Sequence, residues 1–226
     1  MTLVIFDIDG TLVRGSTERR FWRYLFARRR QGPRQILAGA WFLVRFLPRY
    51  GVHVAKKNKA YLVGLKTADV AALAADFVAR EVLPRLYEPA AQRLQQHLRA
   101  GDTVALLSGT LEPIARALAA HLGVQHVRAT ACAELDGRYL AQPPVVHPFG
   151  AQKVGLAAGL AAQLDTDLRL ATAYADSAHD LKLLEAVGSP VAVRPDRKLR
   201  RAARVTAWDV ILADTRNAVA RRPRAA

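Results

Sequence analysis

Acidic residues and cysteines are scarce in this 226-residue chain. It has 34 lysines and arginines against 19 aspartates and glutamates, which gives a formal net charge of +15. The single cysteine, Cys132, permits no intramolecular disulfide and excludes a cysteine-rich zinc site, which fits a reducing compartment. No signal-peptide pattern opens the chain, because acidic residues appear by position 7. We therefore expect a cytoplasmic protein.

Long hydrophobic runs are also missing. The most apolar stretch covers residues 36–47 and is interrupted by Arg45, whereas a transmembrane helix needs about 20 apolar residues. The rest of the composition is ordinary, with 51% hydrophobic and 23% charged residues. These values suit one folded domain, or a core carrying an insertion, rather than a disordered chain.

Most of the positive charge lies between residues 14 and 66. This segment holds fourteen basic residues against one acid, Glu18, and carries +13 of the net +15. The apolar stretch 36–47 lies inside it, so three interpretations stay open. The segment is a cap helix with its apolar face buried, or residues 19–50 contact an anionic membrane surface, or the segment binds nucleic acid. Nucleic acid is the weakest of these, because no recognised motif for it appears.

Predicted strands and helices alternate along the chain. We expect strands at residues 2–6, 103–107, 124–129, 168–174 and 191–193, and a hairpin at 134–142. Helices are expected at 67–83 with Thr67 as N-cap, and at 90–99, 113–122 and 152–164. This order predicts an α/β fold with a Rossmann-like, doubly wound parallel sheet whose active site lies at the carboxyl ends of the strands.

The same pattern divides the chain into a core and an insertion. Residues 1–14 and 88–216 are expected to form the α/β core, and residues 15–87 a helical, basic cap inserted after the first strand. Residues 217–226 form a basic C-terminal tail. The sequence does not indicate an oligomeric state.

Polar residues gather where the predicted strands end. Strand alternation sends Asp7 and Asp9 to the same side, and the strand is expected to end at Gly10, so both carboxylates can approach one cation. Four further polar positions lie at strand or helix ends, namely Ser108-Gly109, Lys153, Asp176 and Asp180. Such a cluster is typical of metal-assisted phosphoryl chemistry.

This constellation resembles the haloacid dehalogenase superfamily of phosphotransferases. Its four motifs match DxDGT at residues 7–11, Ser108, Lys153, and DSxxD at residues 176–180. A helical cap after the first motif is similar to subfamily IB, the branch that contains phosphoserine phosphatase. Ser16 stands where relatives of that enzyme carry an acid, so phosphoserine is not the expected substrate.

The resemblance implies a role for each motif residue. Asp7 would be the nucleophile that forms an aspartyl-phosphate, and Asp9 the general acid and then base. Mg²⁺ would be held by the Asp7 carboxylate, the Asp9 carbonyl and Asp176. Ser108, Gly109 and Lys153 would bind the phosphoryl group, while Asp180 would orient Lys153 or a metal-bound water.

Within this branch, the chain looks most like the phosphatidylglycerophosphatase C type. The likeness rests on the aromatic and basic run at residues 21–30 and on Tyr174-Ala175-Asp176 in the fourth motif. It implies a phospholipid phosphomonoester as substrate and peripheral attachment to the cytoplasmic face of a membrane. Two alternatives stay open: a phosphatase of soluble small metabolites whose cap stretch is buried, and a membrane- or nucleic-acid-binding protein with a vestigial site.

Overall fold

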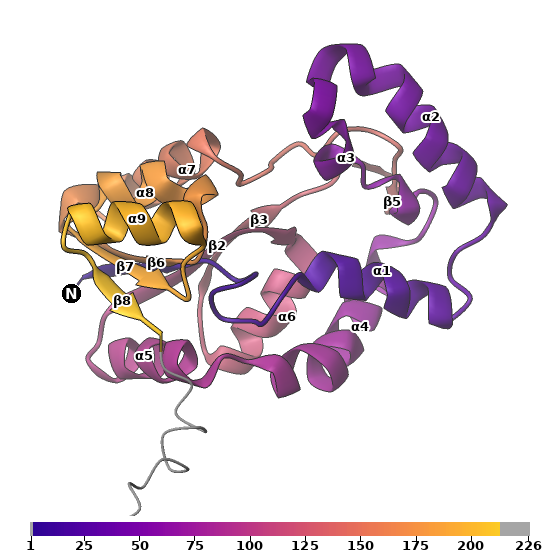
Figure 1. Ribbon diagram of the computed structural model, residues 1–226. Helices are drawn as coiled ribbons and strands as arrows, with labels where there is room; N and C mark the ends of the chain where they lie inside the picture. The colour runs from indigo at the N-terminus through magenta and orange to yellow at the C-terminus, as the bar shows by residue number, and fades with distance from the viewer. Residues whose placement is uncertain (1, 213–226) are drawn as a thin grey trace, which may run out of the picture.

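A central parallel sheet organises the protein, whose computed structural model describes residues 2–212 (Figure 1). Six strands pair in the order β3-β2-β1-β6-β7-β8, and every pairing is parallel. They are β1 (Leu3–Phe6), β2 (Thr103–Leu111), β3 (His126–Thr130), β6 (Thr172–Ala175), β7 (Ser189–Val193) and β8 (Asp209–Ile211). The predicted α/β fold is confirmed.

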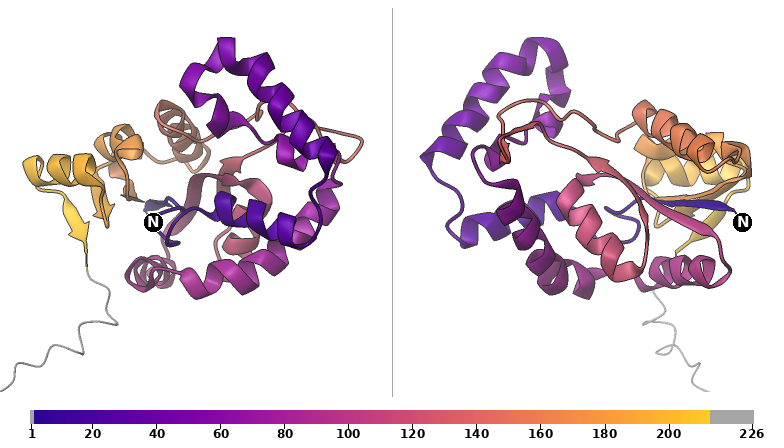
Figure 2. Two further views of the ribbon diagram at one scale, coloured as in Figure 1. Left: turned by 45° about the vertical axis from the view of Figure 1, so that its right-hand side comes forward. Right: turned by 180° about the vertical axis from the view of Figure 1, so that it is seen from behind.

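Helices cover both faces of this sheet (Figures 1 and 2). One face carries α5 (Glu88–Arg99) and α6 (Glu112–Leu122), and the other carries α7 (Ala151–Gln163), α8 (Leu181–Ala186) and α9 (Arg197–Val205). Alternate residues of β1 enter the two cores, because Val4 and Phe6 pack on the α6 side while Leu3 and Ile5 pack on the α7 side. Burial on both faces explains why the strand is apolar throughout.

The segment expected to form the cap, residues 15–87, lies at one end of the molecule, on the right in Figure 1. It contains α1 (Thr17–Ala27), α2 (Pro33–Tyr50), α3 (Val54–Lys57) and α4 (Thr67–Phe77), which continues as a π-helical turn at Val78–Val82. The antiparallel hairpin of β4 (Glu134–Leu135) and β5 (Arg138–Tyr139) bonds to it, since the amide of Gly64 donates to the Tyr139 carbonyl at 2.9 Å. Short 3₁₀ turns cover Gly51–His53, Ala60–Leu62, Leu83–Arg85, Leu168–Leu170 and Ala178–Asp180.

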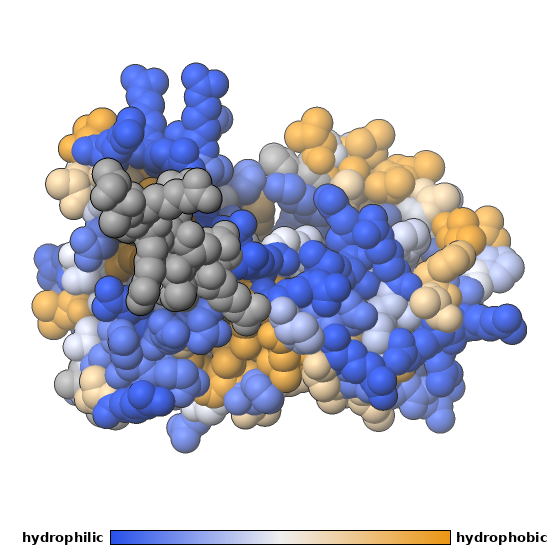
Figure 3. All heavy atoms as spheres, turned by 60° about the horizontal axis from the view of Figure 1, so that its bottom comes forward, coloured by the Kyte–Doolittle hydropathy of each residue, from blue (hydrophilic) through white to orange (hydrophobic). Residues whose placement is uncertain are grey.

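Helix α2 leaves most of its apolar side chains exposed. Of its residues only Phe42 is buried, whereas Leu37, Trp41 and Val44 are 63–70% exposed. Hydrophobic residues accordingly gather at the cap end of the surface in Figure 3. The interpretation that stretch 36–47 is buried cap core is therefore wrong for most of its length. Among residues 2–212, no helix is both long enough and apolar enough to cross a membrane.

Several predicted boundaries are wrong. Strand β1 ends at Phe6, as the predicted strand 2–6 does, and does not continue to Gly10. Strand β2 runs past its predicted end at residue 107 to Leu111, through a register shift. Lys66 rather than Thr67 is the N-cap of α4, because the Thr67 hydroxyl donates to the Gly137 carbonyl instead. The predicted strand 168–174 begins only at Thr172. The predicted tail 217–226 lies outside the described residues.

Candidate active site

Strand register brings the predicted site residues to one edge of the sheet. Phe6 pairs with Leu106 on one side and Tyr174 on the other, so Asp7 emerges between the ends of β2 and β6. The amide of Asp7 still donates to the Tyr174 carbonyl at 3.0 Å, which fixes the backbone of Asp7. Asp176 follows β6 directly, and Ser108 lies within the irregular end of β2. The carboxyl ends of three neighbouring strands thus meet here.

The Lys153 side chain bonds to two carboxylates of this site, those of Asp7 and Asp180. Its Nζ lies 2.6 Å from Asp7 Oδ1 and 2.9 Å from Asp180 Oδ2, and all three side chains are buried. Burial alone would lower the pKa of the Lys153 ammonium, but the carboxylates of Asp7 and Asp180 raise it, so the ammonium stays charged. Burial raises the pKa of Asp7 to about 6, although Lys153 acts in the opposite direction.

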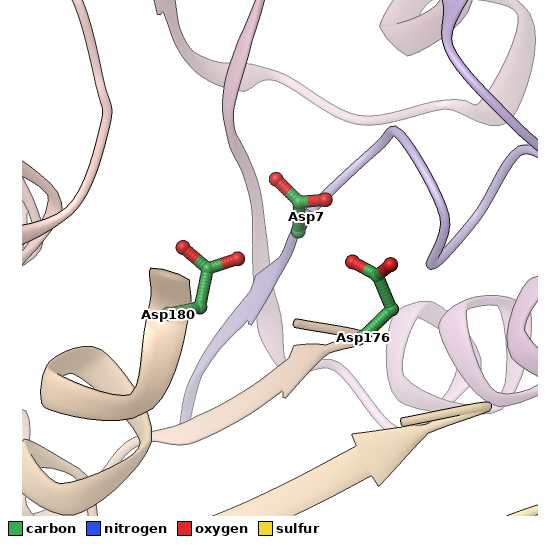
Figure 4. Close-up of side chains that lie close together, drawn as sticks. All are labelled: Asp7, Asp176 and Asp180. Carbon is green, nitrogen blue, oxygen red and sulfur yellow. The ribbon is translucent and has the colours of Figure 1, made fainter. Parts of the chain in front are cut away.

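Three carboxylates converge on a site that suits a divalent cation. One oxygen each from Asp7, Asp176 and Asp180 lies within 4.8 Å of the others, and Figure 4 shows the three groups facing a shared space. Burial, and then the neighbouring Asp7 and Asp180, raises the pKa of Asp176 to about 7. One ammonium leaves this cluster negative, and oxygen ligands are those that Mg²⁺ prefers. The donor set therefore fits the expected ion.

Gly10 allows this cluster to form. Its φ is +88°, and a Cβ at this position would lie 2.0 Å from Asp176 Oδ2, which leaves no space for any other side chain. The hydroxyl of Thr11 also approaches Asp176 Oδ1, at 3.4 Å. The two residues that follow the aspartates in the first motif thus position the carboxylate of the fourth.

Asp9 lines the same cavity as Asp7 but has different partners. Its Oδ1 accepts from the backbone amide of Thr17 at 3.0 Å, at the start of α1. Burial raises the pKa of Asp9 to about 7, and its hydrogen bonds to Thr17 only partly oppose this. A carboxyl group with such a pKa can give and take a proton near neutral pH.

Hydroxyl groups connect the start of α1 to the carboxyl end of β2. The Thr17 hydroxyl lies 3.2 Å from that of Thr110, which lies 3.2 Å from the Ser108 hydroxyl. All three side chains are buried. Thr17 and Thr110 were not predicted as site residues, and the only signal for them in the sequence is that they lie close to Asp9 and Ser108 along the chain.

The loop after β7 supports the fourth motif. Asp196 Oδ2 accepts from the Ala178 amide at 2.9 Å, and the Asp196 amide donates to the Asp176 carbonyl at 2.9 Å. No motif marks this aspartate, so its contribution could not be found from the sequence.

A cavity of about 280 Å³ encloses the site. From the cap, Ser16, Glu18, Lys56 and Lys59 line it, and the core adds His147, Phe149 and His179 at its rim. Lys59 is buried and bonds both carboxylate oxygens of Glu18 at 2.5 Å, so the one acid of the basic segment is neutralised. None of these cap and rim residues was predicted as a site residue, because the chain brings them together from separate segments.

Comparison with known proteins shows which family the chain belongs to. Residues 4–185 match the haloacid dehalogenase-like hydrolase family, and this range contains all the residues of the acidic cluster and Lys153. The chain belongs to this family. It is therefore a hydrolase with the family's α/β fold.

The chain is also similar to individual members of the family. It is 30% identical over 211 residues to phosphoserine phosphatase SerB1 of Mycobacterium tuberculosis, covering 91% of this chain and 68% of that one. A crystal structure of a protein from Bordetella pertussis Tohama I is 28% identical, with a TM-score of 0.79 and coverage of 94% and 99%. Apo phosphoserine phosphatase, at 16% identity and a TM-score of 0.65 over 97% of each chain, shares the fold.

Proposed function

We propose that the protein is a Mg²⁺-dependent phosphomonoesterase that acts through an aspartyl-phosphate on Asp7. The observation that carries this proposal is the Asp7 carboxylate held 2.6 Å from the Lys153 ammonium, in a cavity that also contains Asp9. Lys153 directs one oxygen of Asp7 and leaves the other available for attack on phosphorus. A cation held by Asp7, Asp176 and the Asp9 carbonyl would let the anionic nucleophile approach an anionic phosphate.

Asp9 supplies the proton transfers. Its pKa of about 7 allows it to protonate the leaving alcohol and then, as a carboxylate, to activate the water that hydrolyses the aspartyl-phosphate. The bond from the Thr17 amide fixes one oxygen, so the other faces the leaving group. One carboxyl group thus serves both half-reactions.

The remaining residues stabilise the phosphoryl group. Ser108 and the Gly109 amide lie at the end of β2 and can donate to phosphoryl oxygens, while Lys153 neutralises the charge that develops on them. Asp180 positions Lys153 through its own bond to Nζ. These roles agree with the positions of the side chains around the cavity.

Small phosphate monoesters are the substrate class that the relatives favour. The cavity holds about 280 Å³, which is enough for a phosphate and a small leaving group, and a similar protein is named a phosphoserine phosphatase. A panel of small phosphate monoesters assayed with Mg²⁺ tests this proposal. We expect turnover that chelation by EDTA abolishes; metal-independent turnover, or none at all, would contradict it.

A phospholipid phosphomonoester is a second candidate, favoured by the exposed face of α2. Trp41 and Val44 are exposed there beside Arg45 and Arg49, so an anionic bilayer could hold both the apolar and the basic side chains. The finer likeness to the phosphatidylglycerophosphatase C type, seen in the sequence, points the same way. Attachment of this kind would be peripheral.

Vesicle flotation separates this candidate from the first. Arg28 pairs with Asp76 at 2.7 Å, so the variant to test is R29S/R30S together with W41S. If the candidate is correct, the wild type floats with anionic vesicles at low salt, and the variant does not, while both hydrolyse a small ester. Wild-type protein that stays in the soluble fraction would exclude it.

A further inference from the structure

A second pocket adjoins the catalytic cavity. It encloses about 390 Å³ between the end of α2, helix α3 and the loop that leads into α7. Lys56, His147 and Phe149 line both this pocket and the catalytic cavity. A ligand whose phosphate lies at Asp7 can therefore extend past these three side chains without leaving the protein surface.

Cations and aromatic rings dominate the walls of this second pocket. Arg49 and Lys57 lie 5.3 and 5.1 Å from the centre of the Tyr50 ring, and the Lys56 Nζ lies 4.0 Å from the centre of the Phe149 ring. No aspartate or glutamate lines the pocket. Within residues 2–212, no ion pair joins Arg49, Lys56 or Lys57 to an acidic side chain.

We propose that this basic aromatic pocket binds a second anionic group of the substrate. The substrate class is then a phosphate monoester whose leaving group has an apolar or planar middle and ends in a carboxylate or a second phosphate. The inference rests on the proposed function and gives it a specificity site. Arg49, Lys56 and Lys57 would hold the distal anion, and the Tyr50 and Phe149 rings would pack against the middle of the molecule.

The charges around the two pockets favour an anion over other ligands. Glu18 lines the catalytic cavity on the cap side, but Lys59 and the Tyr61 hydroxyl both bond its carboxylate, so this acid is already paired and is a poor partner for a cationic leaving group. His147 adds no charge near neutral pH, because burial and the nearby lysines lower its pKa to about 4. Desolvation, followed by repulsion from Lys59 and Arg49, likewise lowers the pKa of Lys57. An anion bound here would relieve that repulsion.

Matched substrates test the proposal in the full chain. We compare kcat/KM for ω-carboxyalkyl phosphates of increasing chain length with that for alkyl phosphates of equal length, with Mg²⁺ present. A charge-assisted contact is expected to favour the carboxylated ester by about tenfold at the length that reaches the pocket. A ratio near one at every length would overturn the proposal.

Variants locate the effect. In R49M/K57M the ratio should fall to near one, since both changed residues line only the second pocket. R45M is the matched control, because Arg45 lies one turn earlier on α2, 5.5 Å from the centre of the Phe46 ring, and lines neither pocket. A ratio that persists in R49M/K57M, or that is lost equally in R45M, contradicts the assignment.

Binding of non-hydrolysable phosphonates separates this inference from the proposed function. Calorimetry with ω-phosphonoalkanoates and alkylphosphonates should show the same carboxylate-dependent gain in affinity, which R49M/K57M removes. Carboxylate-dependent binding without turnover of any ester would exclude the phosphatase while leaving the pocket assigned. Turnover without any carboxylate preference would leave the phosphatase and exclude the pocket's role.

Discussion

At the scale of single residues, the site brings buried carboxylates and one buried ammonium together, and each charge is stabilised only by its neighbours. The Lys153 ammonium donates to Asp7 and Asp180. Among residues 2–212, the side-chain partner of the Asp176 carboxylate is the Thr11 hydroxyl, and no lysine or arginine side chain bonds to it. Each of these residues alone would be an ordinary surface or capping side chain by sequence. Their order along the chain predicted the cluster, because each follows a strand or begins a helix of the parallel sheet. The hydroxyl groups beside the cluster could not be predicted: the contacts of Thr110 with Ser108 and Thr17 lie where β2 shifts register.

Replacing Gly10 with alanine should remove metal-dependent activity. The added Cβ would lie 2.0 Å from Asp176 Oδ2, so that carboxylate must move, and a non-glycine residue at φ +88° also costs about 1–2 kcal/mol. G101A is the matched control, because Gly101 has φ +79° with nothing within 4 Å of its Cβ position. Titration of activity with Mg²⁺ should show a strong loss of apparent affinity for G10A and none for G101A. Equal Mg²⁺ dependence in both variants would contradict a role for Gly10 at the metal site.

Replacing Lys153 with methionine should destabilise the fold. Removing one partner of a buried ion pair leaves uncompensated charge, with a typical cost of about 3–5 kcal/mol in the free energy of unfolding. Without Lys153, the folded pKa of Asp7 rises further above its unfolded value, so the loss is greater at pH 8 than at pH 5. Urea unfolding at both pH values, with EDTA present, measures the loss in the free energy of unfolding. The exposed K182M should change stability by less than about 0.5 kcal/mol, and a similar value for K153M would refute this account.

At the scale of elements, apolar segments were predicted better than polar ones. Strands β1 and β2 and helix α6 follow from their apolar residues and from Gly123, which ends α6 with φ +77°. Helix α9, with the sequence RKLRRAARV, was missed because basic residues occupy most of its positions and only Leu199 and Ala203 are buried. The exposed face of α2 agrees with only some of the interpretations left open for this segment, because an apolar stretch alone does not show whether it packs inside the protein or lies on its surface.

The N-cap of α9 should give acid-dependent stability. Burial acts to raise the pKa of Asp196, but bonds from the Leu199 and Ala178 amides outweigh it and hold the pKa below its ordinary value. A depressed pKa means that the stabilisation is complete above the unfolded value of about 3.9 and is lost as the pH falls through the folded pKa. D196A should therefore cost about 1 kcal/mol at pH 6 and progressively less towards pH 3.

Chemical unfolding at several pH values measures this difference. The control is S16A, because the Ser16 hydroxyl caps α1 by accepting from the Arg19 amide at 3.4 Å and does not titrate. Its cost should stay constant with pH. If the loss in unfolding free energy caused by D196A is also the same at every pH, the charge of the Asp196 carboxylate does not provide the stabilisation.

At the scale of the whole molecule, the proposed chemistry and the proposed recognition lie in two different parts. The sheet edge supplies the charged cluster around Asp7, while the cap and the loop before α7 supply the rim of the cavity and the adjoining basic pocket. The sequence predicted the first part from four motifs. The second part could not be predicted because Arg49, Lys57 and Phe149 share no motif and line one pocket only where the end of α2 and helix α3 approach the loop before α7.

The most direct test of the account is the location of the phosphoryl group during turnover. Wild-type protein is mixed with an aryl phosphate and Mg²⁺, quenched in acid, digested and examined by mass spectrometry, alongside D7N and the exposed control D167N. We predict a phosphoryl group on the peptide that contains Asp7 in the wild type and in D167N, and none in D7N, which also loses turnover. Phosphorylation at another residue, or undiminished turnover by D7N, would contradict the central claim.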